Sequence, residues 1–288
     1  DAVIVHLSRP TETLTKANVL DFETLNTIIK DPLLSSSRVL EGMFYKGVVA
    51  TEADADAVFY QRVFQKFDRS NEIHFVNAHN KQTLKKVIYP YKILGIKFAL
   101  IADADVIRDE TEFIDIIKDM ANEELQKTIL DERKIVYSYF QKKDKYTILS
   151  QLKKATLELA EQDIPSADAD LKTIDSALYD FRKQLKKLRE DSDELSSLKK
   201  CGCKALETDP KACQAFNSLV NHCANCGLFI VPVGELESWL VDYGIERSSN
   251  KAKWITRALE ELRSINLDPE KEIWKFIDRL KSYLTYNE

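Results

Sequence analysis

Three apolar runs along the chain each end in a group of acidic side chains. The clearest is Lys97–Asp105, where Phe-Ala-Leu-Ile-Ala precedes Asp-Ala-Asp; the others are Gly47–Thr51 and Gly227–Val233. Runs of this length, bounded by glycine and charge, predict buried strands of a parallel sheet. The carboxyl ends of such strands share the edge where ligands bind in open α/β folds. We therefore expect the acids that follow the runs to converge: Glu52, Asp54, Asp56, Asp103, Asp105, Glu235 and Glu237.

Helical and strand periodicities alternate after Gly47. Asp54–Phe67 and Lys81–Leu94 carry apolar residues at helical spacing, and Glu72–Asn77 between them predicts a strand. Pro90 weakens the second helix near its end. The order strand, helix, strand, helix, strand predicts parallel pairing with right-handed crossovers, and therefore an α/β fold.

The first 46 residues do not fit this alternation. The sequence predicts a strand over Asp1–Arg9, with no partner nearby, and a short helix over Val19–Ile29 that the Asp31-Pro32 pair ends. We interpret residues 1–46 as a joint to another domain, to which the strand belongs. Because the chain does not begin with methionine, we expect a processed product or a piece of a longer protein.

The middle of the chain has a helical pattern. Between Thr111 and Lys200 glycine is absent, and apolar residues spaced three and four apart predict a coiled-coil seam. A weaker apolar face precedes Pro165, so we expect two antiparallel helices joined near Ile164–Asp170. We expect this seam to be buried against a helix of this chain or of a second copy. It consists of Leu171, Ile174, Leu178, Phe181, Leu185 and Leu188.

The α/β pattern resumes at Leu228 and leads into C-terminal helices. Leu236, Trp239 and Leu240 predict a helix after Glu235, and amphipathic helices are expected over Trp254–Leu262 and Glu270–Leu284. The predicted domains are therefore a sheet domain formed by residues 47–110 and 226–288, with a helical insertion over residues 111–225.

Composition narrows the class of protein. The 288 residues are 44% hydrophobic and 31% charged, with a net charge of −5, which excludes a basic nucleic-acid coat but not a nuclease whose metal ions neutralise its site. No apolar run is long enough to span a membrane, and no secretory signal is visible. Five cysteines without such a signal indicate reduced thiols in a cytoplasm.

The cysteines allow two interpretations. They lie within 26 residues and include a Cys-x-Cys and a Cys-x-x-Cys pair, enough ligands for a structural zinc ion. The alternative is that they pack as small apolar side chains, with Gly227 ending the helix that carries the last of them. The residues concerned are Cys201, Cys203, Cys213, Cys223 and Cys226.

Three motifs together resemble a known family. The sequence from Glu52 to Asp56 is similar to the Glu-Gly-x-x-Asp opening of a Toprim domain, and Asp103-Ala-Asp105 resembles its Asp-x-Asp motif. Gly234-Glu-Leu-Glu237 is similar to the closing motif of the overcoming-lysogenization-defect (OLD) nucleases, in which a Toprim domain follows an ABC-type ATPase. The chain departs from the family at Ala53 and at Asn80, where glycine is expected.

The resemblance implies a Rossmann-like Toprim sheet with an inserted helical arm, and a Mg²⁺- or Mn²⁺-dependent endonuclease that uses two metal ions to cleave phosphodiesters. It places Glu52, Asp56 and Asp103 on one ion, and Asp105 and Glu237 on the other, with Glu235 accessory. It assigns charge stabilisation to Lys251 or Lys253, and backbone phosphate contacts to His79 and Lys81. The resemblance also implies that Glu52 and Asp103 are catalytic carboxylates.

The same resemblance implies partners. It predicts a nucleic-acid substrate, DNA before RNA, a homo-oligomer, and a role in anti-phage defence. Because the chain has no Gly-x-x-x-x-Gly-Lys-Ser/Thr motif, an ATPase would act as a fused or separate partner.

Two other functions fit the sequence. The first is an inactive nucleic-acid-binding or assembly module, in which the acids have only a structural role. Asp54 and Glu235, for example, would then serve only as helix caps. A topoisomerase or primase fragment ranks last, because the further domains of such enzymes are missing. A structure in which the carboxylates of Glu52, Asp103 and Glu237 face one shared pocket would favour the nuclease.

Overall fold

The computed structural model describes residues 3–285 except 12, 142–144, 194 and 249. The described residues form a four-stranded sheet in the order β4-β3-β5-β6. All of its pairings are parallel, which confirms the α/β class predicted from the sequence. The strands are β3 (Gly47–Thr51), β4 (Ile73–Asn77), β5 (Lys97–Ala102) and β6 (Leu228–Ile230).

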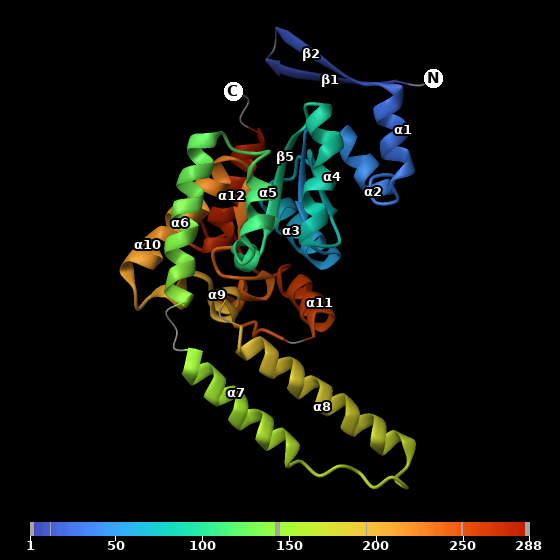
Figure 1. The fold of residues 1–288 in the computed structure, drawn as a ribbon. Helices are drawn as coiled ribbons and strands as arrows, with labels where there is room; N and C mark the ends of the chain where they lie inside the picture. The colour runs from blue at the N-terminus through green and yellow to red at the C-terminus, as the bar shows by residue number, and fades with distance from the viewer. Residues whose placement is uncertain (1–2, 12, 142–144, 194, 249, 286–288) are drawn as a thin grey trace.

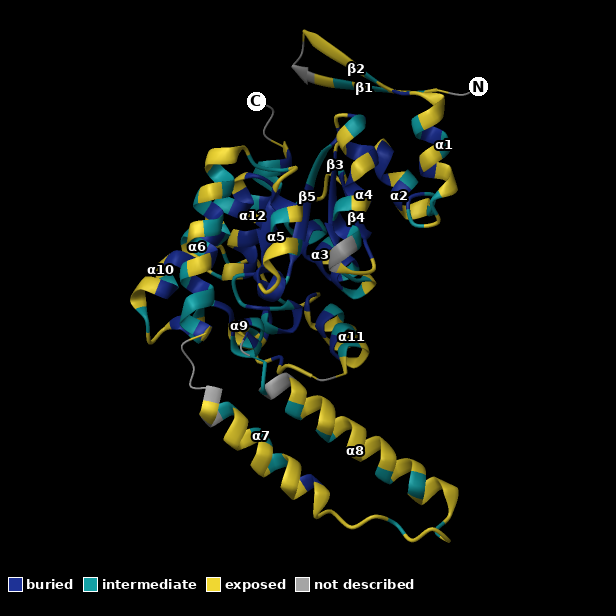
Figure 2. Ribbon diagram, in the orientation of Figure 1, coloured by how far each residue is buried: buried dark blue, intermediate teal, exposed yellow. Residues whose placement is uncertain are grey.

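Helices cover both faces of this sheet, so that the strands are buried except at Lys97 and Phe98, where β5 begins (Figures 1 and 2). Val48 and Ala50 belong to one apolar cluster, whereas Val49 belongs to the other, because successive side chains of a strand point to opposite faces. The first face is covered by α4 (Lys81–Ile93), α5 (Glu110–Ile117), α6 (Glu123–Gln141) and α10 (Pro210–Asn225). The second is covered by α3 (Asp54–Phe67), α11 (Lys251–Glu261) and α12 (Glu272–Thr285).

The N-terminal strand has a local partner, so the expectation of an unpaired strand is wrong. β1 (Ile4–Thr11) pairs antiparallel with β2 (Leu14–Leu20) as a hairpin. The residues expected to begin a helix at Val19 therefore end a strand. The helix begins later because Asp21 accepts a hydrogen bond from the backbone N–H of Thr24 at 2.8 Å. The elements that follow are α1 (Phe22–Lys30), α2 (Ser37–Glu41) and the short 3₁₀ helix η1 (Gly42–Phe44).

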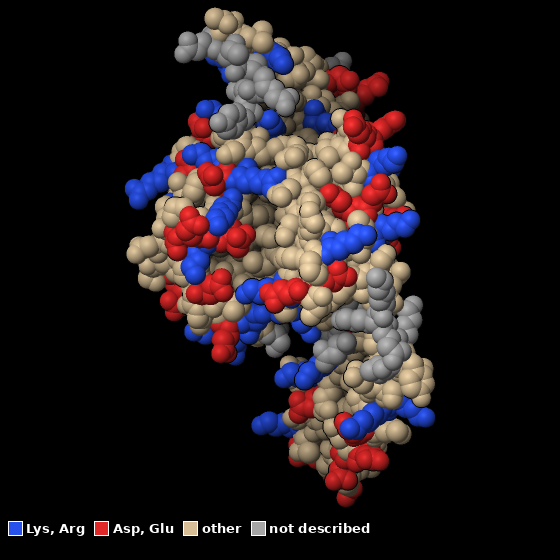
Figure 3. Space-filling view, turned by 90° about the vertical axis from the view of Figure 1, so that its left-hand side faces the viewer, with Lys and Arg blue, Asp and Glu red and all other residues tan. Residues whose placement is uncertain are grey.

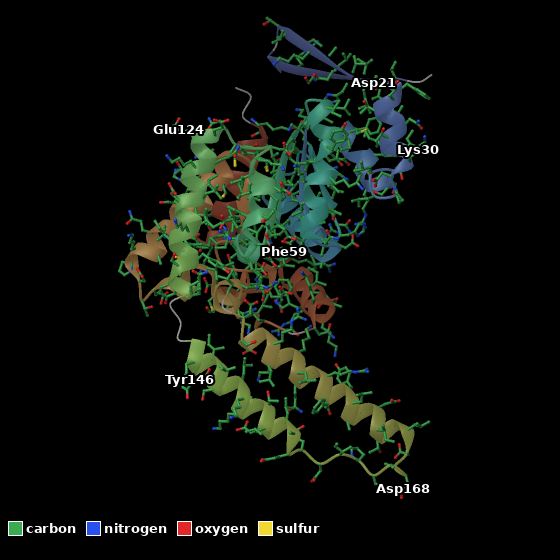
Figure 4. All side chains as sticks on the ribbon, viewed as in Figure 1. Asp21, Lys30, Phe59, Glu124, Tyr146 and Asp168 are labelled. Atoms are coloured by element: carbon green, nitrogen blue, oxygen red, sulfur yellow. The ribbon has the colours of Figure 1, made fainter. Side chains whose placement is uncertain are left out.

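Two helices project from the body as an arm, which we define as α7 (Lys145–Ala160), α8 (Leu171–Asp191) and their connection (Figures 1 and 3). Figure 4 places Tyr146 at the base of the arm and Asp168 at its tip. The prediction of two helices joined near Ile164–Asp170 is confirmed.

The predicted seam of the arm is not buried within this chain. Leu171 is 80% exposed, Leu178 43%, Phe181 39% and Leu185 46%. The expectation of burial against a helix of the same chain is therefore wrong, because α7 lies alongside α8 but covers the stripe only in part. Between the two helices, Gln162 and Gln184 form an amide pair through hydrogen bonds of 2.8 Å and 3.1 Å. Whether a second copy covers the stripe stays a prediction.

Short 3₁₀ turns replace the helix expected after Glu235. The segment forms η4 (Leu236–Ser238) and η5 (Val241–Tyr243), and Gly244 ends it with a φ of +78°. Trp239 and Leu240 still face the core, so their apolar pattern reflects burial rather than α-helix. The remaining elements are η2 (Ala104–Ile107), α9 (Ser196–Cys201) and η3 (Gly202–Leu206).

Candidate functional site

Three chain segments bring the predicted acids to one edge of the sheet. Glu52 directly follows β3 and Asp103 directly follows β5, and these neighbouring strands are in register at Ala50 and Leu100. The loop after β6 returns to this edge, where the backbone N–H of Ala104 donates to the carbonyl of Gly234 at 2.7 Å. That hydrogen bond fixes the Gly-Glu-Leu-Glu motif beside the end of β5.

Burial distinguishes these carboxylates from surface acids. Asp56 is 8% exposed, Asp105 5% and Glu237 9%. Aspartate and glutamate are rarely buried to this extent unless other groups hold them. One oxygen of Asp56 accepts a hydrogen bond from the backbone N–H of Ala53 at 3.2 Å, which closes the first turn of α3. We call Glu52, Asp56, Asp103, Asp105 and Glu237 the acid cluster.

The pKa of Asp103 shows the electrostatic effect of this arrangement. Burial raises the pKa of Asp103 to about 8, and the negative charges of Glu52, Asp56 and Asp105 add to the increase, while Lys199 opposes it. A like charge nearby disfavours ionisation of a carboxyl group. Ionisation of Asp103 is therefore unfavourable in the protein alone, even with Lys199 beside it.

Two lysines lie within the acid cluster. The Nζ of Lys199 is 3.1 Å from Oδ2 of Asp105 and 3.8 Å from Oδ2 of Asp103. The Nζ of Lys251 is 2.9 Å from Oδ1 of Asp56. Burial lowers the pKa of Lys199, but the charges of Asp105 and Asp103 outweigh it, so the net shift is upward and the ammonium is retained. The pKa of Lys251 rises in the same way, because Asp56 outweighs burial.

Two arginines extend the ionic contacts. Arg108 forms an ion pair with Asp193, and its guanidinium also lies 3.6 Å from Oδ2 of Asp105. Arg247 forms an ion pair with Glu235. Glu235 is thus held by a cation of its own.

Buried aromatic side chains support the site. The indole N–H of Trp239 donates to the hydroxyl of Tyr60 at 2.8 Å. Burial raises the pKa of Tyr60 well above its ordinary value; the hydrogen bond from Trp239 opposes this rise, and the charges of Asp56, Asp103 and Glu237 add to it. Tyr60 is therefore a neutral phenol adjacent to three members of the acid cluster.

Two further residues predicted for the site, His79 and Lys253, are exposed, unlike the buried carboxylates. Lys253 is exposed and lines an open hollow along α11 together with Thr256 and Arg257. His79 is exposed and has a φ of +66°. The side chain of Lys81 lies outside the described part of the structure. Asp54 pairs with Arg38 on the surface, whereas Ala53 occupies the N-cap position of α3.

The cysteines do not gather into a zinc site in the described structure. The Sγ atoms of Cys203 and Cys213 lie 2.9 Å apart, while Cys223 and Cys226 are buried and Cys201 is exposed. Burial raises the pKa of Cys203 to about 12, which favours the thiol over the thiolate that binds zinc. The interpretation of the cysteines as small packing side chains fits the structure better.

The part of the chain that is described also contains no preassembled cage of three or more His, Cys, Asp or Glu side chains around a metal-sized position. Lys199 and Lys251 stand among the carboxylates instead. The donor atoms of the acid cluster are all carboxylate oxygens, which are the ligands that Mg²⁺ prefers. The chemistry of the donors therefore fits a hard cation, provided that the lysines release them.

The parallel sheet with acids at its strand ends defines a Toprim-type, Rossmann-like α/β domain. Residues 43–105 match the family model of the "Overcoming lysogenization defect protein-like, TOPRIM domain". This chain thus contains a Toprim domain of the OLD type. A search of curated proteins found no match to the chain. Among the described helices, none has the length and apolarity needed to cross a membrane.

The matched segment includes Glu52, Asp56, Asp103 and Asp105 but ends before the cations that contact them. Sequence reasoning missed Lys199, Arg108 and Arg247. Lys199 meets Asp105 only through the tertiary fold, because 94 residues separate them. Arg108, in contrast, lies three residues after Asp105, so a local signal for it was present in the sequence.

Proposed function

We propose that this protein is a divalent-metal-dependent endonuclease that cleaves nucleic-acid phosphodiesters at the acid cluster. One observation carries the proposal: separate strand ends gather these carboxylates in a buried place, where burial, and in addition the charges of Glu52, Asp56 and Asp105, raise the pKa of Asp103 to about 8. Such a concentration of negative charge is unfavourable for the protein alone and is relieved by cations. The Toprim domain provides the nucleic-acid-related context.

The residues that would hold the cations follow from the strand ends. Glu52, Asp56 and Asp103 would hold one Mg²⁺ or Mn²⁺, and Asp105 and Glu237 a second, with Glu235 beside them. When bound, the ions would supply Lewis-acid activation and neutralise charge at the scissile phosphate. The backbone hydrogen bond from Ala104 to Gly234 keeps the donors of β5 and of the β6 loop in fixed relation.

Lysine side chains of the chain would also contact the phosphate groups of the substrate. The Lys251 ammonium lies 2.9 Å from Asp56, so it stands at the edge of the acid cluster where it would stabilise negative charge on phosphate. Lys253, His79 and Lys81 would contact the phosphate backbone further away. Acidic and basic side chains are interspersed on the face seen in Figure 3. The proposal therefore rests on the acid cluster rather than on a broad basic surface.

We further propose DNA as the substrate, an ABC-type ATPase domain or subunit as partner, and a role in anti-phage defence. The apolar stripe of α8 would join copies of the chain through a coiled-coil contact. The five cysteines are free thiols, which suits a reducing cytoplasm.

A catalytically inactive binding or assembly module is the second candidate. It is favoured by the two lysines, which pair with Asp56, Asp103 and Asp105 as structural ion pairs would. Ala53 in place of the family's glycine points the same way.

A nicking assay separates the two candidates. Purified protein is incubated with supercoiled plasmid in Mg²⁺, in Mn²⁺ and in excess EDTA, and in EDTA followed by an excess of the metal. The nuclease proposal predicts open-circle product with either metal, loss of product in EDTA and recovery on re-addition. Absence of cleavage under all conditions, with DNA binding retained, supports the inactive module.

A further inference from the structure

Lys199 reaches the acid cluster from the inserted helices rather than from the Toprim sheet. It lies on α9, which follows the arm helix α8 after a short connection. Its ammonium contacts both aspartates of the Asp-x-Asp motif, at 3.1 Å from Asp105 and 3.8 Å from Asp103. The inserted helices thus supply a cation to two carboxylates that follow β5.

The position of Lys199 is fixed by close backbone packing. Gly202 has a φ of +56°, and a Cβ there would lie 1.9 Å from the carbonyl oxygen of Pro232. Gly234 has a φ of +109°, and a Cβ there would lie 2.2 Å from the carbonyl oxygen of Lys199 itself. The two glycines let α9 approach the β6 loop more closely than any other residue type would. The backbone of Lys199 is therefore held against the β6 loop, within reach of the acid cluster.

The end of the arm also reaches Asp105 by a second route. Asp193 lies between α8 and α9 and forms an ion pair with Arg108. Arg108 in turn lies 3.6 Å from Oδ2 of Asp105, the same oxygen that Lys199 contacts. A displacement of α8 relative to the sheet would consequently alter both cationic contacts to one carboxylate oxygen.

We infer that Lys199 is an internal counter-cation whose ammonium occupies the place of a divalent ion at Asp103 and Asp105, so that the inserted helices control metal loading. The inference rests on the proposed function, because it requires that these carboxylates bind a metal. Lys199 and a divalent ion compete for this carboxylate: an ammonium at hydrogen-bond distance occupies one lone pair of Oδ2 of Asp105 and repels a second cation brought to the same oxygen. Binding of a divalent ion at Asp103 and Asp105 is therefore weaker while Lys199 is in place, and it becomes stronger when the inserted helices move the ammonium away.

The test is Mn²⁺ binding to metal-free protein, measured by isothermal titration calorimetry and by the electron paramagnetic resonance signal of free Mn²⁺. The variants are Lys199→Met and Lys199→Gln, which remove the charge, and Lys204→Met as control. Lys204 is exposed on the following turn, so its substitution makes the same charge change outside the acid cluster. We expect Lys199→Met and Lys199→Gln to bind Mn²⁺ about tenfold more tightly than wild type, the equivalent of one lost ion pair.

The melting temperature provides a second readout. Metal-free Lys199→Met should have a lower melting temperature than the wild type, because its carboxylates lose their counter-cation. Mn²⁺ should raise the melting temperature of this variant by more than it raises that of the wild type. Lys204→Met should match the wild type in both measurements. Lys199→Gln serves if the methionine variant fails to fold.

The outcomes separate this inference from the proposed function. Unchanged or weaker Mn²⁺ binding by both Lys199 variants, while the wild type binds Mn²⁺, would overturn the counter-cation role but leave the metal site intact. Failure of the wild type and of every variant to bind Mn²⁺ would overturn the proposed function, and the inference with it.

Discussion

The indole N–H of Trp239 donates a hydrogen bond of 2.8 Å to the hydroxyl of Tyr60, across 179 residues of sequence. Tyr60 lies on α3, which begins just after Glu52, and Trp239 lies just after Glu237. The two side chains therefore join the first and last acidic motifs beneath the acid cluster. Both are buried, so each polar group would lack a partner if the other were removed.

Replacing Tyr60 by phenylalanine tests this contact. Tyr60→Phe should lower the free energy of unfolding by about 1–3 kcal/mol, because the buried Trp239 N–H loses its acceptor. Chemical denaturation followed by tryptophan fluorescence measures the change. Tyr89→Phe is the control: Tyr89 is 44% exposed, so the same change should have little effect. Equal stabilities of the two variants would show that the buried hydrogen bond contributes nothing.

The close approach of α9 to the β6 loop depends on glycine. Gly202→Ala should destabilise the protein by about 3 kcal/mol or more, because strain from a positive φ adds to a backbone clash. Gly244→Ala is a matched control, since Gly244 has a φ of +78° but a Cβ there would meet no atom within 4 Å. Gly244→Ala should lower the free energy of unfolding by only about 1–2 kcal/mol. Thermal and urea unfolding of both variants make the comparison, and a Gly202 variant as stable as the Gly244 variant would contradict the packing described for α9.

The pKa of Asp103 predicts how the stability of the metal-free protein depends on pH. Because this pKa rises from 3.8 to about 8 on folding, the native state retains a proton that the unfolded chain releases. The contribution of Asp103 to the free energy of unfolding is therefore fully present below pH 3.8. It is lost as the pH rises toward 8, at no more than about 1.4 kcal/mol per pH unit.

Asp103→Asn isolates this contribution from the other groups that titrate, since Glu52, Asp56, Asp105 and Lys199 all face Asp103. Urea unfolding in EDTA at pH 5, 6, 7 and 8 should give a smaller decrease of stability with pH for the variant than for the wild type. Parallel pH profiles would mean that Asp103 is ionised throughout this range.

The stripe on α8 predicts a property of the assembly. If copies of the chain pair through the arm, the triple substitution Leu178→Glu, Phe181→Glu and Leu185→Glu should reduce the molar mass in solution to that of one chain. These side chains are 43%, 39% and 46% exposed, so the melting temperature of the body should change little. Light scattering measures the mass, with Leu267→Glu, at a residue 46% exposed outside the arm, as control. Identical masses for the wild type and the triple variant would exclude the arm contact.

The sheet and its acids were predictable because their signals are local. A continuous apolar run followed by Asp103 and Asp105 specifies a strand and its polar end without reference to distant residues. The helix over Asp54–Phe67 has the predicted bounds for the same reason. Parallel order then follows from alternation, and convergence of the acids follows from parallel order.

The parts that the sequence did not predict depend on distant contacts or on ambiguous spacing. Lys199 lies 94 residues from Asp105, in a segment with no pattern that relates it to the sheet. The spacing of Leu236, Trp239 and Leu240 fits a helix, but burial of these side chains is achieved by 3₁₀ turns. The heptad pattern of α8 correctly gives a helix, yet periodicity does not say which surface covers it.

The most direct test of the central claim is the nicking rate of Asp103→Asn relative to Asp278→Asn. Both variants exchange a carboxylate for an amide of the same shape, but Asp103 is in the acid cluster whereas Asp278 is exposed on α12. With Mg²⁺ and with Mn²⁺, the account predicts wild-type cleavage of supercoiled DNA by Asp278→Asn and a loss of about a hundredfold or more in Asp103→Asn. The melting temperature of metal-free Asp103→Asn should equal or exceed that of the wild type, because one source of repulsion is removed. Cleavage by Asp103→Asn at the wild-type rate, from a folded preparation, would contradict the claim that the acid cluster is the catalytic site.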